Sequence, residues 1–322
     1  MVTGASRGAG RGIALALGKE GAVVYATGRS VKGGPTTDGL PGTVDQTAEE
    51  VTAWGGQGIP VRCDHTSDGE VEALFERVGQ EQGRIDLLVN NVWGGYEAYD
   101  VDSFDLPFWE QPLSRWDKMF GAGVRAHFAA SRLAVALMIP RGKGLIVNTT
   151  FWDRDKALAS LPYDVAKTAV NRLAYMMALE LRTHNIAAVA LSPGWMRTEA
   201  VLAHDHTPEE LESTESVEYI GRAVVALAAD PNVMDKSGRV LTVGDLAREY
   251  DFTDVDGSQP PAQFVGNHVH FTGSDAAPEV AIAEGERMAR NMTAHESFGA
   301  VSSRILSLDD LDPVLTACLL YT

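Results

Sequence analysis

Short apolar segments alternate with helical stretches through the first 245 residues, and this alternation limits the possible folds more than any other feature of the chain. We predict strands at 22–27, 59–64, 85–91, 144–150, 186–193 and 238–243. We predict helices near 11–20, 45–54, 69–82, 115–138, 162–184 and 216–229. The strands are nearly continuous apolar runs, which is typical of parallel strands that are buried on both faces. The alternation therefore predicts an α/β fold in which a doubly wound parallel sheet carries helices on both faces.

The chain changes in composition near residue 250. From Asp251 onward, 11 acidic residues stand against 3 arginines and no lysine, which gives a net charge of −8. We therefore expect one α/β domain over 1–250 and an acidic C-terminal extension over 251–322. At the other end, only MVT precedes the first glycine of a glycine-rich turn. We therefore expect the first strand of the sheet to be truncated.

The charge and the apolar pattern argue against several classes of protein. The formal net charge is −17, and a nucleic-acid partner is not expected because binding phosphate backbones needs a basic surface. We find no run of about 18 apolar residues and expect no membrane span. The two cysteines, Cys63 and Cys318, lack the spacing of metal ligands. We predict no metal site, and reduced thiols of this kind suit a cytoplasmic protein.

The stretch TGASRGAGRGIA joins the first predicted strand to the first helix. In such a turn, Gly4 permits the tight bend, Gly8 lets the backbone approach a pyrophosphate, and Gly10 allows close packing of helix and strand. The N-terminus of the helix then presents unpaired amides to phosphate groups. This context predicts a Rossmann-type dinucleotide-binding domain, with Ser6 and Arg7 of the same turn among the cofactor contacts.

The end of the second predicted strand indicates which nicotinamide cofactor is bound. A site that selects NAD places an acidic residue there, against the ribose 2′-hydroxyl, but this chain has Gly28 and Arg29. Arg7 lies in the glycine turn nearby. Two guanidinium groups suit a 2′-phosphate, so we predict that NADP(H) is favoured over NAD(H). The alternative is that both arginines are simply solvated.

A tyrosine and a lysine stand four residues apart at the start of a predicted helix. Pro162 is well placed for the first helical turn, so Tyr163 and Lys167 lie on one helix face. An ammonium beside a phenol favours the phenolate and lowers the pKa of the tyrosine from about 10. Tyr163 is therefore a candidate general acid for carbonyl reduction, or base for alcohol oxidation. Taken alone, the same pattern also fits two unrelated surface residues.

Four motifs, TGASRGAG, LLVNN, YDVAK and SPGWMRTE, occur in this order over about residues 1–245, and together they resemble the short-chain dehydrogenase/reductase family. Two longer stretches, PFWEQPLSRWD and SGRVLTVGDLAREYDFTDVDG, look like its branch called dehydrogenase/reductase family member 1. The resemblance implies that Asp64 contacts the adenine, that Asn90 lies beside the cofactor ribose, and that Lys167 binds that ribose. It also implies that four residues flank the nicotinamide carboxamide: Pro193, Gly194, Met196 and Thr198.

The chain departs from the family pattern at two positions in these motifs and the helix that follows. Trp93 stands where a glycine is usual, and Gly123 stands where the family has an asparagine that holds a proton-relay water. The relay must then be rebuilt from other groups, or catalysis is weaker. Five tryptophans (93, 109, 116, 152 and 195) follow strand ends, where a doubly wound sheet binds its ligand, so we expect an apolar or aromatic pocket. The alternative is that these rings pack the long 92–114 loop.

The hydroxyl residue that orients the substrate is ambiguous in the sequence. Counting 13 residues back from Tyr163, a spacing usual in the resembled family, gives Thr150. Matching the strand LIVNTT to the family strand gives Phe151 instead, which cannot donate a hydrogen bond. We assign the catalytic hydroxyl to Thr150, with Thr149 structural and Phe151 in the pocket wall.

These features predict an NADP-dependent oxidoreductase that transfers a hydride between nicotinamide and a carbonyl or alcohol substrate. Tyr163 exchanges the proton, and the partner is a small molecule that is apolar or aromatic. The alternative is a dinucleotide-binding regulator with little or no catalysis; an epimerase or dehydratase using the same pair is a third possibility. In the resembled family, the helices near 115–138 and 162–184 form the usual dimer surface, so we expect a homodimer or homotetramer.

Overall fold

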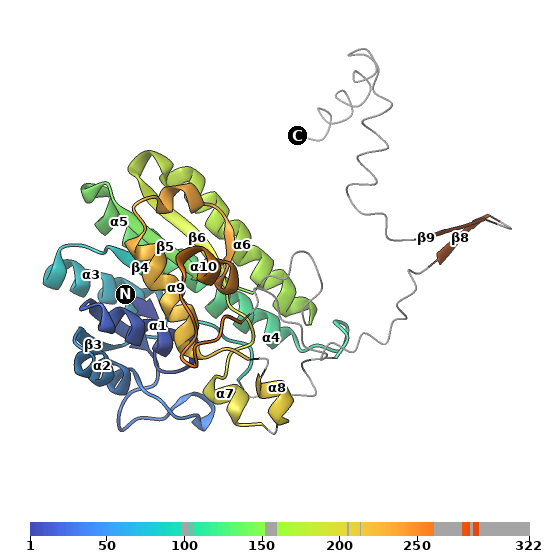
Figure 1. Ribbon diagram of the computed structural model, residues 1–322, viewed down its shortest axis with the longest axis horizontal. Coiled ribbons are helices and arrows are strands. Elements are labelled where there is room, and N and C mark those ends of the chain that lie inside the picture. The colour runs from blue at the N-terminus through green and yellow to red at the C-terminus, as the bar shows by residue number, and fades with distance from the viewer. Residues whose placement is uncertain are drawn as a thin grey trace, which may run out of the picture. The chain divides into compact units, whose positions relative to one another are not determined.

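Seven parallel strands form the central sheet of the protein, in the order β3-β2-β1-β4-β5-β6-β7 (Figure 1). The computed structural model describes residues 1–97, 104, 106–151, 160–204, 206–212, 214–260, 279–283 and 286–289. The strands are β1 (Val2–Thr3), β2 (Val23–Gly28), β3 (Gln57–Arg62), β4 (Leu87–Asn90), β5 (Gly144–Thr149), β6 (Ile186–Ser192) and β7 (Val240–Thr242). This order confirms the doubly wound α/β fold.

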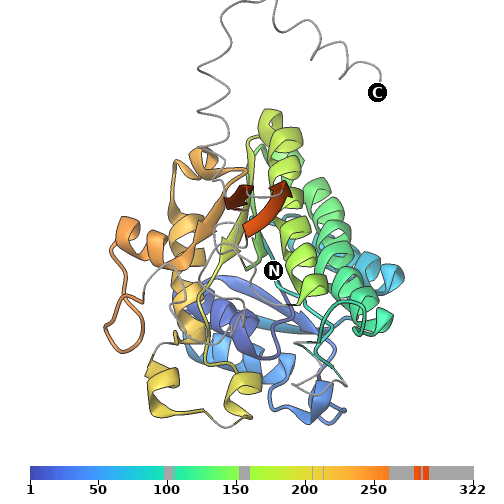
Figure 2. The same ribbon diagram turned by 90° about the vertical axis from the view of Figure 1, so that its right-hand side faces the viewer.

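Helices cover both faces of the sheet. One face carries α1 (Gly8–Lys19), α2 (Val44–Ala53), α9 (Val217–Ala229) and α10 (Val243–Tyr250). The other carries α3 (Asp68–Gln82), α5 (Ala126–Met138) and α6 (Leu161–Leu181). In Figure 2, the green and yellow-green helices α5 and α6 lie on one side of the sheet and the orange helices α9 and α10 on the other.

The alternation of side chains along the strands fills both layers of the core. Val147 and Val189 pack with α1 and α9, whereas Ile146 and Ala188, one position earlier, pack with α3 and α6. All four side chains are fully buried. Because both faces of β5 and β6 are covered, nearly every position of these strands is apolar or small, which explains the nearly continuous apolar runs of the sequence.

The first strand is short, as expected, and lies at the centre of the sheet. Val2 pairs with Ala26 of β2 and with Val89 of β4. The chain leaves β1 toward α1 on one side of the sheet and reaches β4 on the other, so the strand order reverses between β1 and β4. In doubly wound sheets, ligands bind at such a reversal, beyond the carboxyl ends of the strands.

The helix expected over 115–138 consists of three segments. They are α4 (Leu113–Lys118), a π-helical segment η3 (Met119–Arg125) and α5. A π-helical turn inserts extra backbone into a helix and is frequent at functional sites. The stretch Leu113–Arg141 is also long and apolar enough to span a membrane, with a mean hydropathy of 1.3. This stretch packs against α3, α6 and β4, and 39% of its apolar window is buried.

The chain divides into two compact units, Met1–Asn267 and His268–Thr322. In the first unit, residues that follow α10 stay attached to the domain. The carboxylate of Asp254 is 1% exposed and accepts hydrogen bonds from the backbone amide and the hydroxyl of Ser216. Ordered structure of the first unit therefore continues past residue 250. In the second unit, β8 (Glu279–Ala283) and β9 (Glu286–Ala289) form an antiparallel pair.

Candidate active site

The glycine turn has the geometry that its sequence predicts. Gly4 and Gly8 adopt positive φ angles of 66° and 54°. A Cβ atom at Gly10 would lie 2.3 Å from the carbonyl oxygen of Gly4, so only glycine fits there. The backbone amide of Gly8, at the N-terminus of α1, donates to the carboxylate of Glu199 at 2.7 Å. The turn thus already holds an anionic oxygen, as binding a phosphate requires.

A cavity of about 810 Å³ extends from this turn along the carboxyl ends of the central strands. Six of the predicted cofactor residues line it: Gly4, Ser6, Arg7, Gly8, Arg29 and Asp64. Asn91, Trp93 and Tyr96 line it from the segment after β4. The donors of the glycine turn, the cationic side chains and the cavity size together fit a dinucleotide.

The two arginines predicted at the 2′-phosphate are both engaged by protein groups. The guanidinium of Arg7 donates to the carbonyl oxygens of Leu40, Pro41 and Gly42 and thereby holds the loop that follows β2. Arg29 lies at the end of β2, and its Nη2 atom is 2.9 Å from Oε1 of Glu97. Arg29 is therefore placed for a phosphate but already paired, whereas Arg7 has a structural role.

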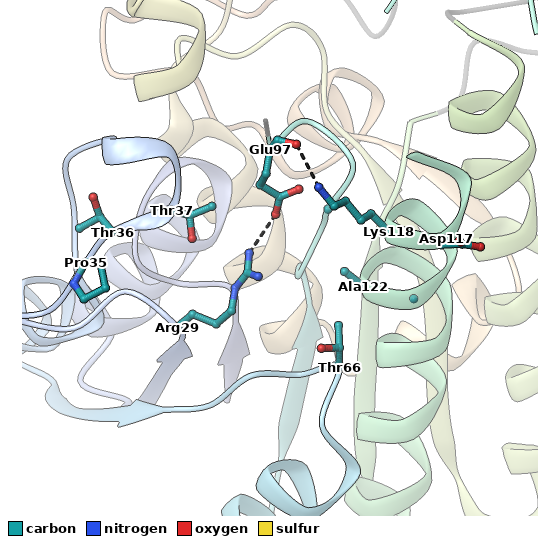
Figure 3. Close-up of a pocket in the computed structure, with 11 residues that line it drawn as sticks. Arg29, Pro35, Thr36, Thr37, Thr66, Glu97, Asp117, Lys118 and Ala122 are labelled. Atoms are coloured by element: carbon teal, nitrogen blue, oxygen red, sulfur yellow. Dashed lines mark hydrogen bonds and ion pairs between the residues drawn. The ribbon is translucent and has the colours of Figure 1, made fainter. Parts of the chain in front are cut away.

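Glu97 contacts three residues of the site: Arg29, Gly95 and Lys118. A second cavity of about 580 Å³ adjoins the first, and Arg29, Glu97 and Lys118 line it. Figure 3 shows the carboxylate of Glu97 facing Arg29 and its backbone carbonyl facing Lys118, whose Nζ donates to it at 3.1 Å. The carboxylate also accepts from the amide of Gly95 at 2.7 Å. Sequence reasoning missed Glu97, because an acidic residue in a loop after β4 carries no motif of its own.

Asn90 and its neighbour face different surroundings. The amide of Asn90 is fully buried and donates to Ser131 of α5 at 2.8 Å and to Asn148 of β5 at 2.9 Å. Asn91 lines the cavity and donates to the carbonyl oxygen of Gly4. The alternation of side chains along β4 directs Asn90 into the helix-covered layer, so the contact with the ribose, predicted for Asn90, is not supported by its position.

The segment that follows β6 is held in place by contacts with residues 214 and 215, which precede α9. Met196 and Glu215 form a parallel β-bridge, and Arg197 donates to the carbonyl oxygen of Thr214 at 2.8 Å. Thr198 caps the short helix α7 (Glu199–Leu202) by accepting from the amide of Val201. Pro193, Gly194, Met196 and Thr198 are thereby held at the carboxyl edge of the sheet, although none of them lines the two cavities described.

Glu215 is a buried carboxyl group in this segment. Its side chain is 2% exposed, and burial raises its pKa to about 8, with the charge of Asp254 adding to the shift. The backbone amide of Gly194 donates to it, which opposes the shift. Its Oε1 atom has no hydrogen-bond partner among the described residues. No motif marked Glu215 in the sequence.

Tyr163 is surrounded by aromatic side chains. Its ring centroid lies 5.4 Å from Trp93, 5.9 Å from Phe104 and 6.3 Å from Phe151. The ring of Tyr96 is stacked near it, at a centroid distance of 6.4 Å. The expected aromatic environment is therefore present around Tyr163.

The other predicted tryptophans pack elsewhere. Trp109 lies against Phe108, Trp116 is stacked on Phe120 at 4.2 Å, and Trp195 packs on His206. Trp152 lies outside the described residues. Of the five, Trp93 is thus the one that contacts Tyr163 within the described structure.

The pKa values at the reactive pair differ from the sequence expectation. Lys167 is 9% exposed, and desolvation lowers its pKa to about 7. Desolvation by the surrounding rings, together with the Tyr96 hydroxyl, raises the pKa of Tyr163 well above 10. The expectation that Lys167 lowers the pKa of Tyr163 is wrong for this arrangement. The Nζ atom is 5.5 Å from the tyrosine ring centroid, and the lysine is itself only partly charged near neutral pH.

The threonine and serine hydroxyl groups close to the start of α6 and the end of β5 differ in their hydrogen bonding. Thr150 is buried, and its hydroxyl donates to the backbone carbonyl of Lys167 at 3.2 Å. The hydroxyl of Thr149 lies 3.3 Å from the carbonyl oxygen of Asn90. Ser160, the residue before α6, is also buried, and its hydroxyl has no partner in the described part of the chain. To donate to a substrate, Thr150 must turn away from the helix, and Ser160 is a second hydroxyl that the sequence pattern did not single out.

Comparison with known proteins gives a consistent family assignment. Residues 1–210 match the family model described as short chain dehydrogenase. The mouse protein named Dehydrogenase/reductase SDR family member 1 is 44% identical over 270 residues, which cover 80% of this chain and 83% of the mouse protein.

Solved structures show the same fold. A short chain dehydrogenase from Mycobacterium thermoresistibile superimposes with a TM-score of 0.68 at 28% identity, over 82% of this chain and 92% of that one. A 7α-hydroxysteroid dehydrogenase, solved with NADH and 7-oxo glycochenodeoxycholic acid, superimposes with a TM-score of 0.62 at 26% identity, over 80% of this chain and 93% of that one.

Proposed function

The chain belongs to the short-chain dehydrogenase/reductase family, in the branch of dehydrogenase/reductase family member 1, and from this premise we propose that it is an NADP(H)-dependent oxidoreductase of apolar carbonyl or alcohol substrates. Members of this family transfer a hydride between a nicotinamide cofactor and a CH–OH or C=O group. The cofactor preference, the substrate class and the residue roles below are proposed.

The arrangement of Tyr163 and Lys167 carries this proposal. Both project from the first turns of α6, beside Trp93 and Tyr96, which line the dinucleotide cavity. A bound nicotinamide supplies or accepts the hydride. Because its pKa is raised, Tyr163 is a neutral phenol that can donate its proton to the oxygen of a carbonyl substrate.

The preference for NADP(H) is supported by the end of β2. Arg29 lines the cavity there, and no acidic residue occupies the strand end to reject a 2′-phosphate. Glu97 pairs with Arg29, so a 2′-phosphate would replace that carboxylate as the partner of the guanidinium. The relative solved with NADH shows that NAD(H) use occurs among similar proteins, which makes the preference a direct object of testing.

The apolar substrate class is supported by the rings around Tyr163. Trp93, Phe104 and Phe151 present hydrocarbon surface to it and few hydrogen-bonding groups. A solved relative carries a 7-oxo bile acid, a ketone on a large apolar skeleton. We propose bulky apolar ketones and the corresponding alcohols as the first substrates to test.

The test is the consumption of NADPH and of NADH with a panel of steroid ketones, aromatic ketones, aldehydes and quinones. Replacing Tyr163→Phe removes the acid and is expected to lower turnover on the order of 10²-fold or more while cofactor affinity changes little. Tight cofactor binding without turnover of any panel member would support the regulatory alternative instead. Equal turnover by the wild type and the Tyr163→Phe variant would refute the assigned role.

The catalytic hydroxyl is tested in the same assay. We propose Thr150, and replacing it with valine keeps the shape but removes the donor, at an expected cost on the order of 10²-fold in turnover. Thr149→Val is the matched control at the neighbouring position. If Ser160→Ala lowers turnover and Thr150→Val does not, the hydroxyl belongs to Ser160.

We also propose a cytoplasmic homo-oligomer. Phe128 of α5 is 53% exposed, and Tyr175 and Leu179 of α6 are 41% and 49% exposed, which gives this side of the molecule large apolar side chains in solvent. Such surfaces are typical of protein–protein contacts. Sedimentation of the wild type and of a Leu179→Glu variant tests the proposal, because a monomeric wild type would contradict it.

A further inference from the structure

The indole of Trp93 is the direct partner of the Lys167 ammonium. The Nζ atom of Lys167 lies 3.7 Å from the centroid of that ring. Among the residues that the structure describes, no carboxylate and no other hydrogen-bond acceptor contacts this ammonium. A tryptophan face is the best aromatic partner for a cation, and the attraction strengthens where water is excluded. The ring therefore provides what a hydrogen-bond acceptor would otherwise supply.

Gly123 of the π-helical segment lies against the same indole. A Cβ atom at Gly123 would be 2.3 Å from Cζ3 and 2.5 Å from Cε3 of Trp93. Ordinary contacts of a Cβ atom are 3.4–4 Å, so no residue other than glycine fits while the ring stays in place. The two departures from the family pattern, Trp93 and Gly123, are thus one structural unit: the large residue occupies the space that the small one leaves.

The remaining groups near Lys167 do not compensate for its charge. His127 of α5 is fully buried, and its Nε2 lies 3.0 Å from the carbonyl oxygen of Val92, to which it donates. Burial and, to a lesser extent, the charge of Lys167 lower the pKa of His127 to about 3, so this histidine is neutral. Tyr163 is a neutral phenol. At neutral pH, the charge on Lys167 therefore depends on how well the ring stabilises it.

We propose that Trp93 is a positioning residue for Lys167: its indole face holds the ammonium beside Tyr163, and Gly123 provides the space for that indole. The proposal rests on the proposed function, since it gives Lys167 a part in the reaction. It predicts that the charge state of Lys167 responds to the electron density of the ring at position 93. A ring that served only as packing would not have this effect.

Fluorinated tryptophan tests this prediction without changing the shape of the side chain. Fluorine withdraws electron density from the ring face, so one, two and three fluorine atoms at position 93 weaken the attraction for a cation stepwise. The measurement is an NMR pH titration of the lysine side chains in the full-length, cofactor-free protein, with Lys167→Arg identifying the resonance. The pKa of Lys167 should fall with each fluorine, by about one unit over the series.

The chain contains its own control. Lys19 Nζ lies 4.0 Å from the ring centroid of Trp54, in a similar geometry, but Trp54 is 54% exposed. The same fluorine series at position 54 should leave the side-chain resonances of Lys19 nearly unchanged, because solvent screens the pair.

A constant pKa of Lys167 across the series at position 93 would overturn the proposal. Turnover does not enter the titration, so its outcome is independent of the proposed function. If the enzyme turns over substrate but the pKa of Lys167 does not change across the series, the proposed function stands and the role of Trp93 is refuted. If the pKa of Lys167 changes but the protein turns over no substrate, the role of Trp93 stands and the proposed function is refuted.

Discussion

Replacing Gly123 with alanine tests the packing of the reactive centre. The indole of Trp93 must move by about 1 Å to restore ordinary contact with the new methyl group, since the Cβ atom of an alanine at this position would lie 2.3 Å from the ring. The ring cannot move freely, because Tyr163 meets it edge-on and Lys167 lies over its face. Overpacking of this kind costs about 1–3 kcal/mol of folding free energy.

The same segment supplies a matched control. The Cβ atom of an alanine at position 121 would have no other atom within 4 Å. Gly121→Ala should therefore stabilise the fold by the usual helix preference of alanine over glycine, up to about 1 kcal/mol. Alanine gains this preference at both positions, so the two variants should differ in the free energy of unfolding by the overpacking cost, about 1–3 kcal/mol. For a domain of this size, that difference corresponds to roughly 2–12 °C in Tm.

The assay is thermal unfolding of the wild type, of both alanine variants, and of each in a Trp93→Ala background. Removing the indole should remove most of the cost of Gly123→Ala, with a coupling of about 1–3 kcal/mol between the two sites. No such coupling is expected for Gly121→Ala. If Gly123→Ala and Gly121→Ala melt at the same temperature, the close approach of the indole is not real and the reasoning fails.

Two further predictions concern charged groups. Replacing Glu97→Gln frees Arg29, so NADPH should bind up to about fivefold more tightly, as expected from the 0.2–1 kcal/mol of an exposed ion pair. In the same binding titrations, Arg29→Ala should weaken the binding of NADPH far more than that of NADH. Equal losses for the two cofactors would contradict the 2′-phosphate role of Arg29. Glu215 has a pKa raised from 4.5 to about 8, so the folded protein keeps its proton between these values while the unfolded chain loses it. The wild type should therefore lose stability relative to Glu215→Gln as pH rises from about 5 to 8, and a pH-independent difference in denaturant unfolding would show that the carboxyl is ionised when folded.

The sheet and the glycine turn could be predicted because local pattern and tertiary structure agree in them. Strands buried on both faces are mostly apolar, and a glycine whose Cβ would lie too close to the carbonyl of Gly4 can be recognised from its spacing. The π-helical turn in η3 has no sequence pattern of its own, and neither has the contact of its Gly123 with Trp93. That contact joins residues 30 positions apart on different elements.

Side-chain partners were predicted less well than positions. Arg7, Arg29 and Thr150 lie near their expected places, but each has another partner. Arg7 binds carbonyl groups of its own neighbouring loop, Arg29 pairs with Glu97, and Thr150 donates to the backbone of α6. A guanidinium or hydroxyl takes the nearest acceptor in three dimensions, and that choice depends on loops that carry no periodic pattern.

The hydrogen bonds of Asp254 determine where the chain can be shortened. Its carboxylate holds Ser216 at the start of α9 and lies 3.8 Å from Arg197, in the segment after β6. A protein ending at Tyr250 would retain every helix and strand that the structure describes in the first unit but leave these donors without their acceptor. Buried donors without partners cost about 1–3 kcal/mol each. The smallest form of this domain that folds on its own must therefore include Asp254, which lies beyond the last helix.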